Sequence, residues 1–524
     1  MAAGNPDVII AGGGIAGLGL ATQLIEQNPE LKITLLERSR FPVNNVTAKV
    51  GESTVEIGSR YLSHTLGLKD HFASQHLQKF GLRCFFGSPQ TDFSQQDELG
   101  VSRRFDLPTF QIERGLVENH LQQRLLAQGV TVLDGVDIES VELGQGTQQA
   151  RFKDQHGQHQ TLHSRWLIDA AGRQALVKNS LGLHKPSHHR GNAIWFRVDK
   201  TIKIDDWSNQ THWHDKIASC GQRWLSTNHL MGPGYWAWVI PLGSGATSIG
   251  LVMDDIAYEQ AAISNYNEAL AWLDQHQPHL AAALSDAKVL DFVNVRDYSY
   301  GCDKLFSSDG WALTGEAGVF ADPFYSPGAD FIALGNDIIS HIISQQSNGQ
   351  AINRDCNVLE FFFTNFFDNT VSVYRQQYGG FGDRQMMSVK LAWDYAFYWG
   401  VLVLLYYKNA VTSVQTIKRF IPDLQHVISL NQTMQALFRE RAQQRRILTP
   451  QGMFIDQYEL PVLHEIIGQL TDESLPLEQA LPNSRRCLEQ LMTYFTDMLS
   501  SNPTKAISDG ERALLADYRH QVLA

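Results

Sequence analysis

Three glycines and one acid near the N-terminus are spaced to hold a dinucleotide. The glycines are arranged as G-x-G-x-x-G, and the acid follows the last of them by 20 positions. Glycines in this pattern let backbone N–H groups approach a pyrophosphate, and the acid accepts hydrogen bonds from ribose hydroxyls. An acid here, instead of an arginine-rich segment, argues against a 2′-phosphate on the adenosine, so FAD or NAD is expected. The candidate contacts are Gly12, Gly14, Ala16, Gly17, Glu37 and Arg38.

The elements around these residues have the order that this chemistry requires. Residues 7–11 are predicted to form a strand, residues 18–27 a helix, and residues 32–37 a second strand that ends on the acid. A glycine turn in this context places a pyrophosphate at the positive end of the helix. The alternative is a glycine turn that only packs a helix against a strand.

Two later strands also run into turns that contain a glycine and an acid. Residues 166–173 carry Asp169 and Gly172, and residues 311–328 carry Glu316. Taken alone, Asp169 or Glu316 is more simply a strand-end cap. Together with Arg114, which opens a predicted helix in QIERGLVENHL, their order resembles the FAD-binding fold of the aromatic hydroxylases. That resemblance implies FAD as the cofactor, a flavin contact from Arg114 and a ribityl contact from the last turn, where hydroxylases usually carry Asp.

Three further segments resemble the flavin-dependent halogenases, also called the tryptophan halogenase family, within this superfamily. YWAWVIPL matches W-x-W-x-I-P, FADPFYSPG matches F-x-x-P-x-x-S-x-G, and QKFG resembles the segment that carries the family's active-site lysine. The sequence GEST at residues 51–54 resembles a turn that the family uses near the flavin. The matching residues are Trp236, Trp238, Ile240, Pro241, Phe320, Pro323, Ser326, Gly328 and Lys79.

This resemblance implies an activity. In the family, reduced FAD and dioxygen give a C4a-hydroperoxide, and a halide beside the ring attacks it to form hypohalous acid. The turn at Ser326, which enters a predicted helix, is the expected halide site, with Pro323 and Gly328 on the cofactor side. Lys79 is expected to hydrogen-bond the hypohalous acid in a separate substrate pocket, because an ammonium is a compact charge with three donors. An ordinary exposed lysine is the alternative.

The two tryptophans share one face of a predicted strand, since side chains alternate with a period of two. Alone, Trp236 and Trp238 are most simply part of a half-buried sheet. Beside Lys79 and the Ser326 turn, they are expected to form a wall that separates the flavin from the substrate.

The substrate class stays open at this point. Tryptophan-specific halogenases carry a glutamate in the turn where this chain has Phe324 and Tyr325, so a phenol, a pyrrole or a carrier-bound acyl group is favoured over free tryptophan. A separate flavin reductase and a halide ion are the other expected partners, because a second dinucleotide motif is not evident. The alternatives are an FAD monooxygenase, which would hydroxylate an aromatic group such as a tryptophan of a partner protein, and a non-catalytic flavin-binding protein.

The expected fold is α/β. It has a Rossmann-like FAD-binding domain of the aromatic-hydroxylase (GR2) type over residues 1–350, with interleaved β-sheet segments of the substrate side at about 60–110 and 185–300. Residues 351–524 are predicted to be mostly helical and to cover the substrate. The aromatic run at residues 391–407 is predicted to be a buried or pocket-lining helix, because it is short for a membrane span and contains Asp394. Its candidate lining residues are Trp393, Tyr395, Phe397 and Tyr398.

Composition excludes several other classes. The net charge of −12 argues against a nucleic-acid partner. The cysteines, Cys84, Cys220, Cys302, Cys356 and Cys487, are widely spaced and odd in number, which favours reduced thiols in the cytoplasm. Histidines at 188–189 and 212–214 lack a third ligand at suitable spacing, so they are expected in solvated loops and a metal site is not expected.

Overall fold

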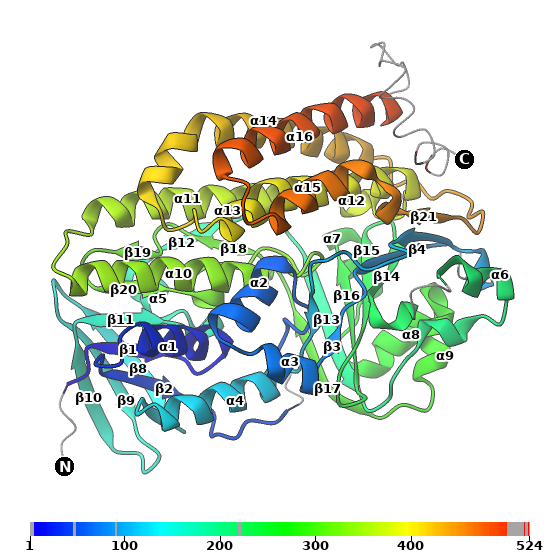
Figure 1. Ribbon diagram of the computed structural model, residues 1–524. Helices are drawn as coiled ribbons and strands as arrows, with labels where there is room; N and C mark the ends of the chain where they lie inside the picture. Colours follow the sequence, from blue (N-terminus) through cyan, green and yellow to red (C-terminus); the bar gives the residue numbers. More distant parts are fainter. Residues whose placement is uncertain are drawn as a thin grey trace.

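The computed structural model describes residues 5–45, 49–87, 89, 92–217, 222–499, 518 and 522. Its first layer is a mainly parallel sheet, at the left of Figure 1. The strand order is β19 (Phe306–Ser307), β20 (Trp311–Leu313), β11 (Trp166–Asp169), β1 (Val8–Ala11), β2 (Ile33–Glu37) and β7 (Thr131–Asp134). All four residues of β1 and of β11 are buried. Such continuous apolar strands are typical of a parallel sheet that is covered on both faces.

Helices and a smaller sheet cover this layer. Helix α1 (Ile15–Gln27) connects β1 to β2 and packs against α4 (Arg114–Ala127). The smaller sheet, β10–β9–β8 (His159–Ser164, Gln148–Lys153 and Asp137–Leu143), contacts β1 and β11. The predicted strand, glycine turn, helix and acid-tipped strand are therefore confirmed, and with them the α/β class.

A second, eight-stranded sheet lies to the right in Figure 1. Its order is β17 (Val289–Val295), β13 (Asn192–Val198), β16 (Thr247–Met253), β15 (Tyr235–Pro241), β14 (Thr227–Gly232), β4 (Leu82–Phe86), β5 (Asp97–Gly100) and β21 (Phe454–Asp456). The chain therefore enters this sheet from three separate stretches. One face is covered by α7 (Asp255–Ala261), α8 (Tyr266–His276) and α9 (Pro278–Leu284). Strand β15 lies inside the sheet, paired antiparallel with β14 and β16.

Short elements connect the two sheets. The strand pairs are β3 (Leu77–Gln78) with β6 (Phe110–Gln111), and β12 (His184–Pro186) with β18 (Tyr300–Cys302). The short helices are α2 (Glu56–Arg60), α3 (Lys69–Gln75), α5 (Leu176–Leu181) and α6 (Thr211–His214). The turn between β3 and β4 carries Lys79.

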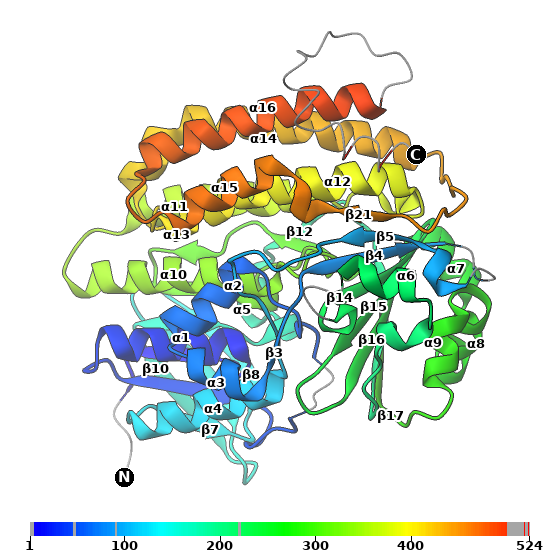
Figure 2. The ribbon, with the colours of Figure 1, turned by 45° about the vertical axis from the view of Figure 1, so that its right-hand side comes forward.

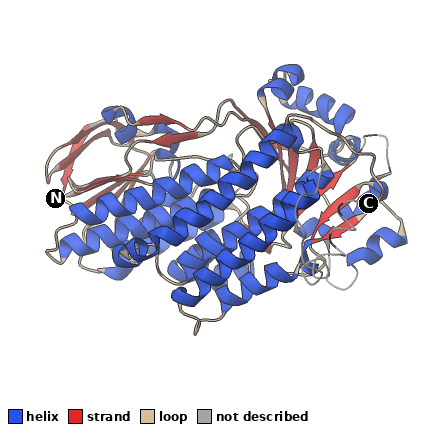
Figure 3. Ribbon diagram, turned by 90° about the horizontal axis from the view of Figure 1, so that it is seen from above, coloured by secondary structure: helices blue, strands red, loops and turns tan. Residues whose placement is uncertain are grey.

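Long helices from the last third of the chain lie over both sheets, as Figures 2 and 3 show. They are α10 (Gly328–Ser347), α11 (Asn353–Ser372), α12 (Arg384–Phe397), α13 (Leu404–Tyr407), α14 (Val414–Ala442), α15 (Pro461–Thr471) and α16 (Leu477–Leu499). A π-helical segment, Tyr398–Val403, joins α12 to α13 into one continuous helix. π-helical turns inside helices occur frequently at functional sites.

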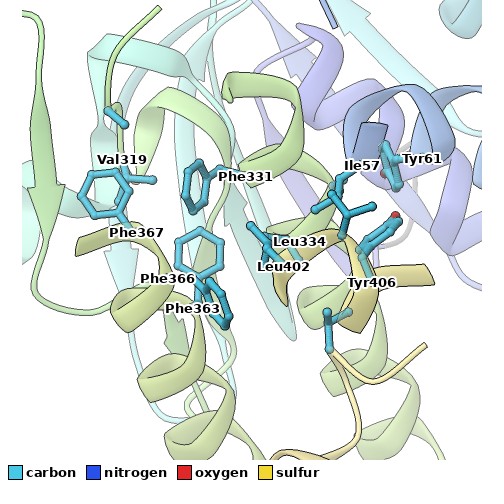
Figure 4. Packing of buried hydrophobic residues seen from close by; sticks show 14 of the residues in the cluster. Ile57, Tyr61, Val319, Phe331, Leu334, Phe363, Phe366, Phe367, Leu402 and Tyr406 are labelled. Carbon is cyan, nitrogen blue, oxygen red and sulfur yellow. The ribbon is translucent and has the colours of Figure 1, made fainter. Parts of the chain in front are cut away.

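One hydrophobic core joins these helices to the dinucleotide side. Figure 4 shows Ile57 and Tyr61 of the α2 region facing Tyr406 of α13, and Phe331 of α10 beside Phe363 of α11. The Phe331 and Phe363 ring centroids are 5.5 Å apart in an edge-to-face arrangement, a geometry that aromatic pairs prefer. The helices that follow α10 are therefore fixed by packing against α2 and α10.

Several expectations about individual segments can now be compared with the structure. Residues 391–407 form a largely buried helix, as predicted. None of the helices in the described part of the chain combines the length and apolar character that crossing a bilayer requires. The expectation of a solvated loop is wrong for His189, which is buried and bonded to Asp322 at 2.7 Å. His212 and His214 belong to the one-turn helix α6, and Cys220 lies outside the described residues.

Candidate active site

In the glycine turn, backbone atoms pack so closely that side chains larger than hydrogen do not fit. Gly12 has φ +115°, and a Cβ added there would lie 2.2 Å from the carbonyl oxygen of Ala170. A Cβ on Gly17 would lie 2.0 Å from the carbonyl oxygen of Gly12. Larger residues would therefore force the turn apart, and α1 could not begin directly behind it at Ile15. The helix directs the free N–H groups of its first turn toward the space in front of the turn.

Glu37 holds this turn in place. Its Oε2 accepts a hydrogen bond from Gly13 N at 2.6 Å, and its Oε1 accepts one from Ser39 N at 2.7 Å. A carboxylate has about four lone-pair sites, so acceptor capacity remains for a ribose. Glu37 thus fixes the glycine turn and still lines the adjacent cavity.

A cavity of about 400 Å³ lies in front of the glycine turn. It extends from the end of β2 to the turn after β20, so it brings together residues from the three predicted segments. The predicted cofactor contacts that line it are Gly12, Gly14, Ala16, Glu37, Arg38, Arg114, Gly172, Glu316 and Pro323.

Asp169 and Gly17 are not among the residues that line this cavity. The buried Asp169 carboxylate accepts hydrogen bonds from Ala171 N at 3.1 Å and Val177 N at 2.8 Å. Burial raises the pKa of Asp169 to about 6, against these backbone hydrogen bonds, which lower it. The structure therefore gives Asp169 the role of a cap at the end of β11, whereas Gly17 supports the turn by its contact with Gly12.

Arg114 lies where the cavity narrows. Its guanidinium donates to Val50 O at 2.7 Å and to Glu118 Oε1 at 3.0 Å. Its Nε is buried and has no partner among the described residues. An unpaired buried donor is costly, so a bound group that accepts this N–H fits the site. On the opposite side of the cavity, Glu316 forms an ion pair with Arg173 at 3.2 Å. The residues present therefore fit FAD.

A second cavity of about 90 Å³ continues from this point and shares Arg114, Trp238 and Glu316 with the first. Trp236, Ser326 and Gly328 also line it. Ser326 has φ +59°, a conformation that non-glycine residues rarely adopt and that concentrates at functional sites. Helix α10 begins at Gly328, so the free N–H groups of its first turn lie at this cavity. That arrangement suits an anion.

The two tryptophans form one wall of the second cavity. The ring centroids of Trp236 and Trp238 are 5.7 Å apart, and Trp236 also meets Phe324 edge-on at 5.0 Å. Trp238 donates its indole N–H to Ser248 Oγ at 3.1 Å, whereas Trp236 Nε1 is buried without a partner among the described residues. The two indoles are thus held in place by buried contacts with Ser248 and Phe324.

The turn that carries Ser326 is held by a buried carboxylate that the sequence analysis did not identify. Asp322 Oδ2 accepts hydrogen bonds from His189 Nε2 and Tyr298 OH, each at 2.7 Å, and from Tyr378 OH. Its Oδ1 accepts from Phe324 N at 2.8 Å. These contacts join three distant parts of the chain, so local sequence spacing gives no signal for them.

Lys79 lies in a third cavity, of about 130 Å³, which is separate from the second but touches it at Pro327 and Phe331. The lysine is 5% exposed, so the surface-lysine alternative is wrong. Its Nζ donates to Ser53 Oγ at 2.9 Å and to Thr54 O at 3.3 Å. Burial lowers the pKa of Lys79 to about 8, although the charges of Glu56 and Asp330 raise it.

Ser53 links the two sides of the boundary between the cavities. It lines the second cavity, contacts Thr227 Oγ1 at 3.0 Å and accepts the hydrogen bond from Lys79. A small polar molecule that leaves the second cavity therefore meets hydroxyl groups before it meets the ammonium. The GEST segment that resembled a flavin-side turn thus also contributes to the lysine side.

The aromatic residues of the long helix divide between the cavity and the core. Tyr395, Phe397 and Tyr398 line the lysine cavity, as predicted. Trp393 is not among its lining residues, and it donates its indole N–H to Asn431 at 2.8 Å in the core. Tyr325, in the turn before Ser326, also lines the cavity and donates to Asp394 Oδ2 at 2.8 Å.

Comparisons with known proteins agree with this geometry. Residues 5–244 match a family model described as an FAD-binding domain. The flavin-dependent halogenase chlA of Dictyostelium discoideum is 30% identical over 369 residues, which are 64% of this chain and 60% of that protein. The chain is thus similar to flavin-dependent halogenases and spans less than two thirds of the length of the Dictyostelium relative. A 1H-pyrrole-2-carbonyl-[peptidyl-carrier protein] chlorinase of Pseudomonas fluorescens is 25% identical over 345 residues, or 62% of this chain and 72% of the chlorinase.

A solved structure extends the likeness to most of the fold. The crystal structure of halogenase PltM aligns with a TM-score of 0.67 at 16% identity, covering 94% of this chain and 96% of that one. At this identity the likeness concerns the fold alone, including the helical layer beyond the FAD-binding match. The cofactor is FAD, and the lining of the first two cavities fits it.

Proposed function

We propose that this protein is an FAD-dependent halogenase that acts on an electron-rich aromatic substrate in the Lys79 cavity. The observation that carries the proposal is the separation of two cavities. Trp236 and Trp238 line the flavin-side cavity and not the Lys79 cavity, and the two cavities meet at Pro327 and Phe331. A substrate held in the Lys79 cavity can be reached by a small diffusing reagent. Direct oxygen transfer from the flavin to such a substrate is disfavoured.

The bound cofactor would supply the oxidising chemistry: reduced FAD, with dioxygen and a halide, yields hypohalous acid. The chain's own residues carry the remaining steps. The first turn of α10, after Ser326, offers free N–H groups to the halide. The tryptophan wall keeps the aromatic substrate out of the flavin-side cavity. Lys79 then receives the hypohalous acid and, through its ammonium, makes the halogen more electrophilic.

The electrostatics of the lysine cavity support this role. A lysine with a pKa of about 8 remains an ammonium near neutral pH and still transfers a proton readily. Two carboxyl groups, Glu56 and Asp330, lie close enough for their charges to act on it. Hydrogen bonds to Ser53 and Thr54 orient its Nζ at the boundary between the cavities.

The partners follow from the same reasoning. We propose that a separate flavin reductase supplies reduced FAD, because the sequence shows one evident dinucleotide motif. The first test is consumption of NADH by the pure protein with added FAD. Slow consumption is expected, and rapid stoichiometric consumption would contradict the need for a reductase.

The proposed activity is tested with photoreduced FAD, oxygen and either chloride or bromide. Monochlorodimedone reports hypohalous acid that escapes into solution, and a panel of phenols and pyrroles reports halogenation inside the protein. We expect halide-dependent products from both assays. A hydroxylated aromatic product that forms equally well without halide would instead support a monooxygenase and refute the halogenase.

A further inference from the structure

One buried carboxyl group in the lysine cavity has no role in the steps above. Glu56, the first residue of α2, lines the cavity and is 9% exposed. Burial raises the pKa of Glu56, and its own backbone amide, the Lys79 charge and the Trp399 indole offset part of that cost. A buried carboxyl group that is weakly compensated is expensive for the fold, so it is a candidate for function.

Asp330, the other carboxyl group near Lys79, has a structural explanation. Its Oδ1 accepts from Gly58 N at 2.8 Å and its Oδ2 accepts from Tyr398 OH at 2.6 Å, so it fastens α2 and the π-helical segment to α10. Glu56, by contrast, is hydrogen-bonded by its own backbone amide and by the Trp399 indole, which lines the same cavity.

The cavity around Glu56 has the size and surface of a site for one aromatic ring. Its volume of about 130 Å³ is close to that of an engineered apolar cavity of roughly 150 Å³ that takes up benzene. Phe105, Leu107, Phe366, Phe397 and Leu402 supply apolar wall. The lining also contains polar residues, among them Arg104, Asp330 and Asp394, and Glu56 lies in it together with Lys79.

We propose that Glu56 binds the hydroxyl group of a single-ring phenol in this cavity and takes up the ring proton that the halogen displaces. The inference rests on the proposed halogenation and names its substrate class. One carboxylate oxygen accepts the phenol O–H, and the other lies toward the ring carbon next to it. The halogen is therefore directed to the position ortho to the hydroxyl group.

The step balances without any further reagent. The ring's electron pair forms the carbon–halogen bond as the oxygen–halogen bond of hypohalous acid breaks, with its electron pair going to oxygen. Lys79 gives that oxygen a proton, and water leaves. The ring proton passes to Glu56, and its transfer to the neutral Lys79 amine restores both groups. The sum is arene plus hypohalous acid to halogenated arene plus water.

The experiment compares FAD-loaded wild type with Glu56→Gln, Glu56→Asp and a matched control, Glu360→Gln. Glu360 is a partly buried carboxyl group with a pKa that burial raises, to about 7. It accepts hydrogen bonds from Leu305 N and Phe306 N and lines none of the three cavities. Calorimetry measures binding of phenol and of anisole, which lacks the O–H. Chromatography measures 2-bromophenol and 4-bromophenol formed with photoreduced FAD, oxygen and bromide.

The expected result has three parts. Glu56→Gln binds phenol about tenfold or more weakly than wild type, as loss of a hydrogen bond to a charged group implies, and it binds anisole as wild type does. The wild-type excess of 2-bromophenol disappears in Glu56→Gln and returns in part in Glu56→Asp. The Glu360→Gln protein and the FAD affinity of every variant match wild type.

The proposal is overturned if Glu56→Gln weakens the binding of phenol and anisole equally, or if it leaves the binding of both unchanged. It is also overturned if the excess of 2-bromophenol survives in Glu56→Gln. A general folding defect would lower FAD affinity and is detected by that titration. Absence of any halide-dependent product from wild type, with monochlorodimedone included, refutes the proposed function and the proton transfer together. The comparison of phenol binding by wild type and Glu56→Gln would then still test the contact between phenol and Glu56.

Discussion

Replacement of Lys79 by methionine tests the catalytic role of the ammonium in a protein that still folds. The side chains are similar in length, but the ammonium and its hydrogen bonds to Ser53 and Thr54 are lost. A positioned proton donor contributes about 10²- to 10⁴-fold to a rate. We therefore expect Lys79→Met to lower phenol bromination at least about 100-fold. Monochlorodimedone bromination in solution is expected to continue, because hypohalous acid forms on the other side of the tryptophan wall.

The same substitution is expected to stabilise the protein. Burial shifts the pKa of Lys79 from 10.5 to about 8, which corresponds to about 3 kcal/mol against the charged form in the fold. Methionine removes that cost but also deprives Glu56 and Asp330 of a nearby positive charge, so a net gain of about 1–3 kcal/mol is expected. Thermal unfolding of the FAD-free protein measures it, as an increase in Tm.

The pH dependence follows from the same shift. The folded pKa of about 8 lies below the unfolded value of 10.5, so the unfolded chain binds more protons between these two values. The Lys79 contribution to stability therefore rises with pH across this window in wild type and is absent in Lys79→Met. Lys79-dependent bromination should instead fall about tenfold per pH unit above 8. Equal phenol bromination by both proteins, or a lower Tm for Lys79→Met, would refute the reasoning.

Three other substitutions test the cofactor side. Gly12→Ala places a Cβ 2.2 Å from the Ala170 carbonyl oxygen, so FAD binding should be lost in a fluorescence titration; wild-type affinity would contradict the close approach. Asp169→Asn leaves one backbone N–H of the cap facing an amide NH₂, which should cost about 1–3 kcal/mol in denaturant unfolding while the FAD Kd stays unchanged; a weaker Kd with intact stability would make Asp169 a cofactor ligand. Trp236→Ala removes a buried indole at a cost of about 3–5 kcal/mol and should increase monochlorodimedone bromination relative to phenol bromination, whereas an unchanged ratio would argue against the wall.

The fold was predictable where local pattern and function coincide. The glycine spacing, the acid at the end of β2 and the helix between them are set within about thirty residues, and the structure has them as expected. The helix at residues 391–407 was predictable for a related reason, since an apolar run of this length with Asp394 inside it is more stable packed in protein than in a bilayer. The π-helical segment within it gives no signal in the sequence.

The sites that were missed depend on long-range packing. Asp322 lies in the FADPFYSPG segment without a local pattern that marks it, yet His189, Tyr298 and Tyr378 all hydrogen-bond it from distant parts of the chain. Glu56 is the first residue of α2, and an acid at a helix N-terminus is ordinary because the helix dipole favours negative charge there. Its burial is decided by α10 and the π-helical segment, which lie more than 250 residues further along the chain.

By itself, the sequence determined the cofactor class, because the glycine turn acts through local backbone geometry, and it predicted Lys79, Trp236 and Ser326 as candidate site residues. Only the tertiary structure decided which of these groups share a cavity. Lys79 lies in the turn between β3 and β4, Trp236 in β15 and Ser326 before α10, and burial by the helical layer sets both their separation and the pKa of the lysine. Desolvation is a property of everything that packs around a group, so no local spacing could have predicted it.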